Sequence, residues 1–291
     1  MKVVFIGTVQ TSKVFLEKTI ECGADVVGVC TKNKSKFNSD FVDITPVCRK
    51  NDIEYRYVDD INSEENISWI SSLKPDFIFC FGWSFLIKEK LLSIPKHGVI
   101  GFHPAELPRN RGRHPLIWSI FLGLKQTAST FFFMDSGADT GDILSQSPVD
   151  ISPQDDAGSL YDKVCRVASK QIEEFIPLLK SGNYTRKKQN HDLANSWRKR
   201  KKPDGKIDFR MNSNSVCRLV RALTKPYVGA HVEWMDNDVK IWEAVESHAD
   251  FPNLEPGKIL SVKNEIITVK TYDSAVMLLK HDFKGILPKA G

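Results

Sequence analysis

The sequence predicts an α/β protein with a mostly parallel, Rossmann-like sheet in its N-terminal part and a smaller, OB-like β-barrel at its C-terminus. Short apolar runs alternate with segments of helical spacing in the first half, which is typical of a parallel sheet covered by helices on both faces. Near the C-terminus, only turns separate the strand-like runs. We predict a catalytic domain over residues 1–190, a basic linker over 191–209 and a β domain over 210–291.

Five runs in the N-terminal half are rich in apolar, β-branched and aromatic residues and are short enough to be strands. Between them, apolar residues recur three and four positions apart, which is typical of helices packed on a sheet. The ligand crevice of such sheets lies at the carboxyl ends of the strands. The predicted strands cover residues 2–7, 25–31, 53–58, 75–83 and 96–104, and the predicted helices lie at 12–23, within 39–52 and at 63–74.

The chain continues with one more predicted helix and strand before the C-terminal domain. In that domain a single helix is followed by strand-like runs, and turn residues such as those at 235–238 and 262–265 separate them. A small OB-like barrel can bind RNA, but many such barrels only build a dimer or shield a site, so the pattern assigns no role. The helices are expected over 116–127 and 213–224, and the strands over 129–134, 230–235, 239–247, 257–271 and 274–283.

Composition excludes several classes of protein. The chain is 41% hydrophobic and 26% charged, and no run approaches the roughly 18 apolar residues of a membrane span. Its six cysteines are scattered without a C-x-x-C pair, which predicts reduced thiols in a cytoplasmic protein. The net charge of +5 comes largely from the runs at 186–188 and 197–206. Such runs form either a solvated linker face or a contact with a phosphate-rich partner, and charge alone does not choose between them.

The turn after the first strand, G-T-V-Q-T-S at 7–12, excludes two common nucleotide sites. It has a single glycine, so it matches neither the G-x-G-x-x-G dinucleotide fingerprint nor the G-x-x-x-x-G-K-[ST] phosphate loop. This disfavours a nicotinamide-dependent oxidoreductase and a P-loop NTPase. The hydroxyl of Thr8 and the following helix N-terminus suit an anion, or they only cap the helix.

Two polar segments, 98–115 and 128–144, carry the densest chemistry in the chain. His103 and Asp139 lie at the ends of two predicted strands that flank one helix, so we expect them to meet at one edge of the sheet. A carboxylate beside a histidine orients the ring and stabilises its charged form, as proton transfer requires. The acids after residue 134 lack the closing glutamate of a calcium loop, and we expect no metal.

The motif H-P-x-x-L-P-x-x-R-G at 103–112, followed by A-D-T-G-D-I at 138–143, resembles the folate-dependent formyltransferases. The compact loop R-N-R-G-R-H-P at 109–115, with Trp118 after it, is most similar to that of the sugar-nucleotide N-formyltransferases, which are related to methionyl-tRNA formyltransferase. The resemblance implies that His103 and Asp139 are catalytic and that N10-formyltetrahydrofolate is the co-substrate. It also implies that the pterin binds in the segment 81–87, for which we expect contacts from Gly82, Trp83, Leu86 and Ile87.

One residue departs from the family pattern. The family has an asparagine two residues before the histidine, where it helps to stabilise the oxyanion, and this chain has Gly101 there. Loss of one oxyanion donor costs about 10²–10³-fold in rate. We therefore expect a substitute donor, such as a backbone N–H, another side chain, Asn110 or protonated His103, or else a slow enzyme.

The resemblance also implies a substrate class. Arginine suits a diphosphate because its planar fork donates two parallel hydrogen bonds. Similarity to the amino-arabinose members of the family makes Arg113 the leading candidate for substrate binding, with Arg109 and Thr8 as further candidates, while Arg111 is expected to buttress the loop. We expect a dTDP- or UDP-linked amino-dideoxysugar as acceptor, in lipopolysaccharide (O-antigen) or other surface-polysaccharide synthesis. The alternatives are a methionyl-tRNA formyltransferase and an inactive module. We expect a homodimer, and neither nucleic acid nor membrane as partner.

Overall fold

A computed structural model describes residues 1–35, 38–283 and 287–291, and the chain in it divides into two compact units. The predicted domain boundaries stay a prediction. The compact units differ from them because residues 191–197, predicted to be linker, belong to the first unit. Unit 1 consists of Met1–Pro115, Thr127–Asp150 and Asp162–Trp197, and unit 2 of Leu116–Gln126, Ile151–Tyr161 and Arg198–Gly291.

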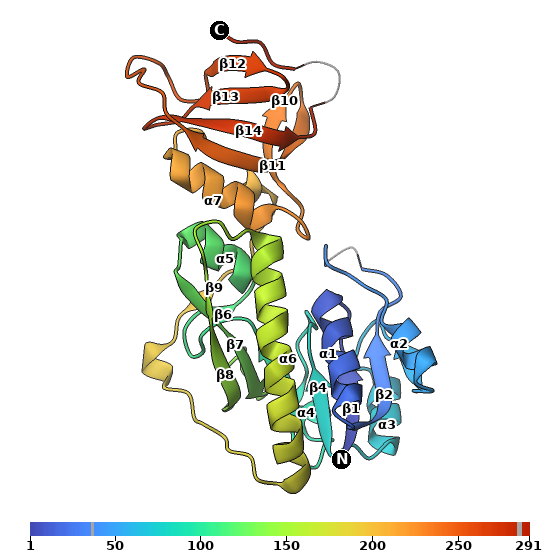
Figure 1. Cartoon of the computed structure of the whole chain (residues 1–291). Coiled ribbons are helices and arrows are strands. Elements are labelled where there is room, and N and C mark those ends of the chain that lie inside the picture. Colours follow the sequence, from blue (N-terminus) through green and yellow to red (C-terminus); the bar gives the residue numbers. More distant parts are fainter. Residues whose placement is uncertain (36–37, 284–286) are drawn as a thin grey trace. The chain divides into compact units, whose positions relative to one another are not determined.

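Unit 1 is built on a seven-stranded sheet of order β3-β2-β1-β4-β5-β7-β8 (Figure 1). Strands β3 to β5 are parallel to one another, whereas β7 is antiparallel to β5. The direction of the order reverses between β1 and β4, which is the switch point where sheets of this kind open a crevice. The strands are β1 Lys2–Ile6, β2 Asp25–Thr31, β3 Tyr55–Tyr57, β4 Phe77–Cys80, β5 Val99–His103, β7 Gln126–Phe133 and β8 Ile143–Asp150.

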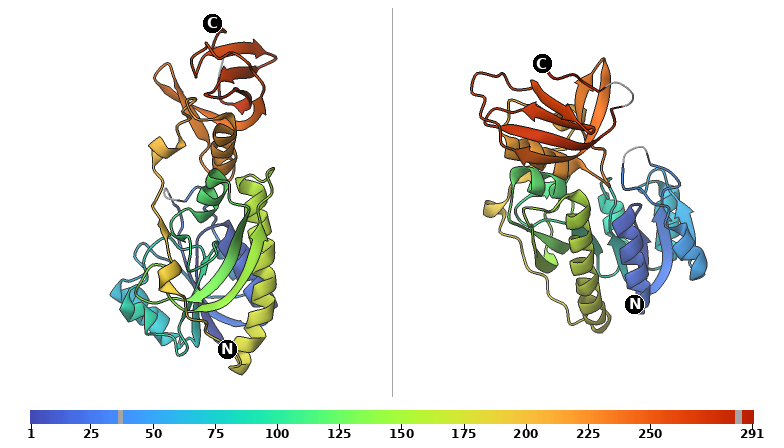
Figure 2. Two further views of the ribbon diagram at one scale, coloured as in Figure 1. Left: turned by 90° about the vertical axis from the view of Figure 1, so that its left-hand side faces the viewer. Right: turned by 45° about the horizontal axis from the view of Figure 1, so that its top comes forward.

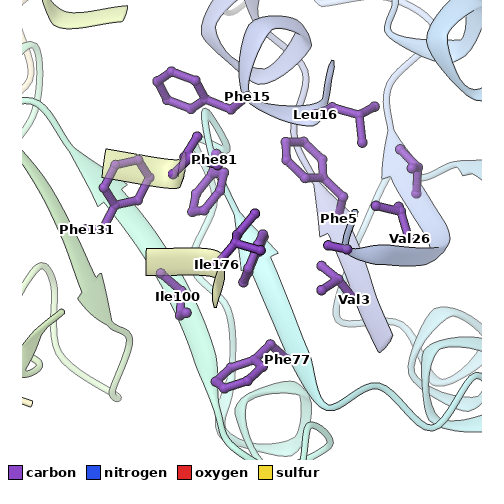
Figure 3. Close-up of a cluster of buried hydrophobic side chains, with 14 of the residues drawn as sticks. Val3, Phe5, Phe15, Leu16, Val26, Phe77, Phe81, Ile100, Phe131 and Ile176 are labelled. Carbon is purple, nitrogen blue, oxygen red and sulfur yellow. The ribbon is translucent and has the colours of Figure 1, made fainter. Parts of the chain in front are cut away.

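Helices cover both faces of this sheet, because successive strand residues point to opposite sides. Phe5 packs into a cluster with Phe15 of α1 and Ile176 of α6, as Figure 3 shows. Its neighbour Ile6 packs instead with Ile70 of α3, in a second cluster on the other face. The helices are α1 Gln10–Glu21, α2 Thr45–Lys50, α3 Glu64–Ser72, α4 Glu89–Leu92 and α6 Ala157–Ser181.

Aromatic rings fill the core beneath the carboxyl end of β4. Phe81 is fully buried and stacks on Phe79 with ring centroids 5.2 Å apart. It also meets Phe131, labelled beside it in Figure 3, edge to face, with ring centroids 5.1 Å apart. Such pairs contribute about 0.5–1.5 kcal/mol each beyond their buried area. The loop that begins at Gly82 is therefore anchored by a packed aromatic core.

Unit 2 combines a five-stranded antiparallel sheet of order β10-β11-β14-β13-β12 with helix α7, which lies along one face of the sheet (Figures 1 and 2). The Asn212 side chain caps α7 by accepting from the Ser215 N–H, and Val216 and Val220 are fully buried. Its elements are α5 Pro115–Leu122 (from Leu116), α7 Ser213–Leu223, β10 Ala230–Trp234, β11 Asn237–Ser247, β12 Ile259–Lys263, β13 Ile266–Lys270 and β14 Ala275–His281.

The predicted fold class is confirmed, including the mostly parallel sheet and the C-terminal antiparallel one. The predicted helix over 116–127 is too long, because Gly123 adopts a φ of +71° and ends it. Strand β8 and the 25-residue helix α6 were not predicted. In the described part of the chain, no helix is long and apolar enough to cross a membrane. All six cysteines are free thiols, as expected.

Candidate active site

His103 is the last residue of β5 and is buried, with only 5% of its surface exposed. Its Nε2 lies 2.8 Å from the backbone oxygen of Asn110. A carbonyl oxygen only accepts hydrogen bonds, so Nε2 carries a proton and the neutral ring presents a lone pair at Nδ1. The chain thus fixes the tautomer of His103 and leaves Nδ1 as the atom that can take a proton.

Asp139 lies opposite that nitrogen. Its Oδ2 is 3.6 Å from Nδ1 of His103 and accepts a hydrogen bond of 2.9 Å from the Gly112 N–H. At 3.6 Å the contact is electrostatic rather than a direct hydrogen bond. The carboxylate therefore faces Nδ1 without occupying it.

The structure brings His103 and Asp139 together by a route other than the predicted one. Because β7 is antiparallel to β5, its last residue, Phe133, pairs with Ile100 near the start of β5, far from His103. The segment 134–142 then folds back toward His103. Asp139 within it has a φ of +58°, in the left-handed region that is unfavourable for residues other than glycine.

Gln189, which the sequence analysis did not identify, holds this segment. It is 6% exposed, and its amide nitrogen donates to the backbone oxygens of Asp139 at 2.9 Å and of Gly141 at 2.7 Å. Its amide oxygen accepts from Nε and Nη2 of Arg111. A single glutamine carries no recognisable motif, so nothing in the sequence singled it out.

Arg111 has the contacts of a buttress. It is 9% exposed, and besides Gln189 it contacts Nδ1 of His191 at 3.0 Å. Its backbone belongs to β6 (Arg111–Gly112), which pairs in parallel with β9 (Ser196–Trp197). These contacts match the structural role that we expected for it.

The three candidates for substrate binding lie in different surroundings. Arg113 is half-buried, and its Nη1 donates to the Ser84 oxygen at 2.8 Å. Burial lowers the pKa of its guanidinium, and the charge of Asp139 partly opposes that shift. Arg109 is exposed. Thr8 is only 1% exposed, and its hydroxyl has no hydrogen-bond partner in the described structure.

The four candidates for pterin binding also differ. Gly82 has a φ of +74°, and a Cβ there would lie 2.4 Å from Ser12 Oγ, so only glycine fits. Trp83 is half-buried, with Nζ of Lys32 5.4 Å from its ring centroid. Leu86 is 59% exposed, whereas Ile87 is 1% exposed and packs in the core. Leu86 is therefore open to solvent, Gly82 and Trp83 are partly exposed, and Ile87 supports the segment from the core.

Neighbouring side chains fill the space beside Gly101, the position where the family has an asparagine. A Cβ on Gly101 would lie 2.8 Å from Cγ of Met134 and 3.0 Å from Cζ of Phe132. No side chain fits beside these neighbours unless they move. Asn110, one expected substitute, has its backbone oxygen on His103 and its N–H on Oδ1 of Asn195.

The neighbouring acidic residues serve the turn. Oδ1 of Asp135 accepts hydrogen bonds from the Gly137 N–H and the Thr140 hydroxyl. Among the residues whose placement is described, no three His, Cys, Asp or Glu side chains gather as metal ligands would. Asp135 thus shapes the turn from within, while Gln189 holds the segment from outside.

Comparison with known proteins gives matches along most of the chain. The family model "Formyl transferase" matches residues 1–176, and "Formyl transferase, C-terminal domain" matches residues 199–287. The methionyl-tRNA formyltransferase of Geobacter sulfurreducens is 31% identical over 290 residues, which cover 98% of this chain and 90% of that relative.

Two solved structures share the fold. WlaRD, a sugar 3N-formyl transferase in the presence of dTDP and 5-N-formyl-THF, superposes with a TM-score of 0.71 at 16% identity, over 95% of this chain and 96% of its own. The N-formyltransferase of Helicobacter canadensis, in complex with folinic acid and dTDP-3-aminofucose, gives a TM-score of 0.70 at 17% identity, over 96% and 98%. At such identities the likeness is one of fold.

Proposed function

This chain belongs to the formyl transferase family, and from that premise we propose that it is a sugar-nucleotide N-formyltransferase. It transfers the formyl group of N10-formyltetrahydrofolate to the amine of a dTDP- or UDP-linked amino-dideoxysugar. Two relatives of the same fold are described with a folate and with dTDP or a dTDP-amino sugar, which supports the proposal. The place in O-antigen synthesis, the homodimer and the cytoplasmic location stay predictions.

The pair His103–Asp139 suits the chemistry of formyl transfer. The amine nitrogen attacks the formyl carbon and forms the new C–N bond, and His103 accepts the amine proton at Nδ1. Asp139, with Oδ2 3.6 Å away, stabilises the resulting imidazolium. The tetrahedral intermediate then breaks its bond to N10, which takes up a proton, and tetrahydrofolate leaves.

The observation that carries the choice of substrate is the placement of Arg113. Its guanidinium is half-buried between the Ser84 oxygen, in the segment expected to bind the pterin, and the charge of Asp139. A planar, partly desolvated guanidinium binds a diphosphate more strongly than an exposed one, because water competes less and its fork matches two oxygen atoms. The acceptor's diphosphate would then be held next to the catalytic pair.

The contacts of the basic run at 198–202 in unit 2 also favour a sugar nucleotide over tRNA as the acceptor. Arg198 donates to Oδ2 of Asp204 at 2.8 Å, and Lys202 lies 2.6 Å from Oδ2 of Asp238. Arg200 is 8% exposed, with its guanidinium 4.6 Å from the ring centroid of Trp118. These cations are engaged within the unit, whereas gripping tRNA requires cations that face phosphates.

Methionyl-tRNA formyltransferase remains the second candidate, because a relative with that name is 31% identical over 98% of this chain. For this activity the protein must bind a large polyanion, the tRNA, as well as the amine that is formylated. The affinity of the protein for tRNA would then fall steeply as the salt concentration rises.

One experiment separates these functions. Release of tetrahydrofolate is followed with the purified chain, N10-formyltetrahydrofolate and, in turn, dTDP-, UDP- and GDP-linked amino sugars and methionyl-tRNA. We expect turnover with a dTDP- or UDP-linked amino sugar. Turnover with methionyl-tRNA alone would refute the proposal in favour of the second candidate. No turnover, together with no binding of folate by calorimetry, would indicate an inactive module.

A further inference from the structure

The segment 189–197 follows helix α6 and was predicted to be mostly linker, yet it contacts the loops that carry both members of the catalytic pair. Its β9 strand pairs in parallel with β6, which lies eight residues after His103. The Gly112 N–H, within this ladder, donates to Oδ2 of Asp139. A segment far away in sequence therefore lies within one hydrogen bond of each catalytic loop.

The first contact is made by Gln189, on the side of Asp139. Its amide nitrogen donates to two backbone oxygens, those of Asp139 and Gly141, and its amide oxygen accepts two hydrogen bonds from Arg111. An amide supplies a donating and an accepting end together, whereas a carboxylate of the same length would face the two carbonyl oxygens with negative charge. These bonds fix Asp139 in the left-handed conformation, which is uncommon outside glycine although aspartate tolerates it better than most residues.

The second contact is made by Asn195, on the side of His103. Its Oδ1 accepts from the Asn110 N–H at 2.9 Å, and its backbone oxygen accepts from the Arg111 N–H at 3.0 Å. Asn110 is also left-handed, with a φ of +61°. Two successive N–H groups are thus fixed, and the carbonyl of Asn110 points at Nε2 of His103.

We propose that segment 189–197 positions both catalytic side chains, with Gln189 acting through the backbone of Asp139 and Asn195 acting through Asn110 on the tautomer of His103. The inference rests on the proposed function in one respect, that His103 and Asp139 are the catalytic pair. Gln189 and Asn195 are positioning residues, because their hydrogen bonds act through other residues.

The positioning role of Gln189 is tested by Gln189→Leu and Gln189→Glu, with Gln171→Leu as the matched control. Gln171 is also a buried glutamine, 1% exposed, whose amide nitrogen donates to the backbone oxygen of Ser129 and to the hydroxyl of Ser145 rather than to either catalytic loop. We expect both Gln189 variants to lower kcat about 100-fold with little change in KM, since misplacing a reacting group by about 1 Å costs that much. Gln171→Leu should keep kcat within about 2-fold of wild type at a temperature where all variants are folded.

Gln189→Glu separates positioning from support of the fold. It retains an oxygen that accepts from Arg111, so it should melt closer to wild type than Gln189→Leu, and still lose the same fraction of kcat. If either variant lost kcat no more than Gln171→Leu does, the positioning role of Gln189 would be overturned.

The arm of Asn195 is tested without any substrate. In protein labelled with ¹⁵N-histidine, the nitrogen shifts of His103, identified by their loss in His103→Ala, report which ring nitrogen carries the proton. We expect the Nε2–H tautomer in the wild type and a mixture in Asn195→Ala. Asn212→Ala is the control, because Asn212 also accepts from a backbone N–H, that of Ser215, but at the start of α7 in unit 2.

An unchanged tautomer in Asn195→Ala would overturn that arm of the proposal. The nuclear magnetic resonance result does not depend on the acceptor. If the wild type turned over with none of the amines, the proposed function would fail, and the positioning of His103 would still be decided by the spectra.

Discussion

Two arginine-rich segments of the chain look alike in sequence but differ in their partners. In R-N-R-G-R at 109–113, Arg111 donates to the neutral amide oxygen of Gln189 and Arg113 to the neutral carbonyl of Ser84. In R-K-R-K-K at 198–202, Arg198 forms an ion pair with the carboxylate of Asp204.

The type of acceptor decides what such charges can do. A neutral acceptor orients a guanidinium without offsetting its charge, whereas a carboxylate offsets it. The buried Arg111 uses this to hold the loop, and the half-buried Arg113 does so in the field of Asp139. The count of cations, which was all that composition offered, does not separate a binding loop from a structural one.

The largest effect should come from the catalytic pair beside the first segment. Asp139→Asn and His103→Ala should each lower kcat by about 10²–10⁴-fold, the usual contribution of general acid–base catalysis. Asp139→Asn keeps an oxygen for the Gly112 N–H, so its thermal unfolding should stay close to wild type. Steady-state rates and melting curves check this, and a variant that retained most of the activity would show that the pair is wrongly assigned.

A smaller effect is expected from Arg113→Lys, which keeps the charge of the first segment and removes its planar fork. The KM for the sugar nucleotide should rise about 10–100-fold, equivalent to one lost charge-assisted hydrogen bond. Arg166→Lys, at an exposed position of α6, serves as the control and should not change KM. Equal KM values for the two variants would remove Arg113 from the binding site.

The second segment should respond in stability rather than in rate. Arg198 holds the pKa of the Asp204 carboxyl well below its usual range, so the stabilisation is present above the unfolded pKa of about 3.9 and is lost as the pH falls through the folded value. Asp204→Asn should lower the free energy of unfolding by about 1 kcal/mol at pH 7, and by less at pH 3. Urea unfolding at both pH values measures this, and a difference that grew on acidification would contradict it.

The smallest effect is expected from Lys202→Ala, which removes a cation paired with Asp238. If the substrate is a sugar nucleotide, kcat/KM should stay within about 2-fold of wild type at both 50 and 200 mM salt, because no phosphate contact is lost. A marked loss of kcat/KM, with a weaker salt dependence than wild type, would indicate that the second segment grips nucleic acid and would undo the comparison.

The strands and helices predicted from sequence were mostly correct because each has its own local pattern, as in D-V-V-G-V-C-T at 25–31. Strand β8 was missed because I-L-S-Q-S-P-V-D is mixed in polarity and contains a proline. The pair His103–Asp139 came from motif order, and the reason offered for their meeting was wrong, since the antiparallel β7 and the returning segment 134–142 bring them together.

Gln189 and Asn195 lay beyond prediction for a different reason. Their partners are 78 and 85 residues away, and an amide side chain shows no pattern until the fold brings a carbonyl or an N–H to it. Functional residues that belong to a motif can be located in a sequence. Residues whose role depends only on contacts made in the folded chain cannot.

The filled space at Gly101 also couples substitutions at positions 101 and 134. A Cβ there would lie 2.8 Å from Cγ of Met134, so an asparagine can enter position 101 only where residue 134 gives way. The residues at positions 101 and 134 are therefore best replaced together. A larger side chain at 101 alone causes a clash, and a smaller side chain at 134 alone leaves a void. Gly101→Asn is therefore expected to need either a shifted Met134 side chain or a smaller residue at position 134.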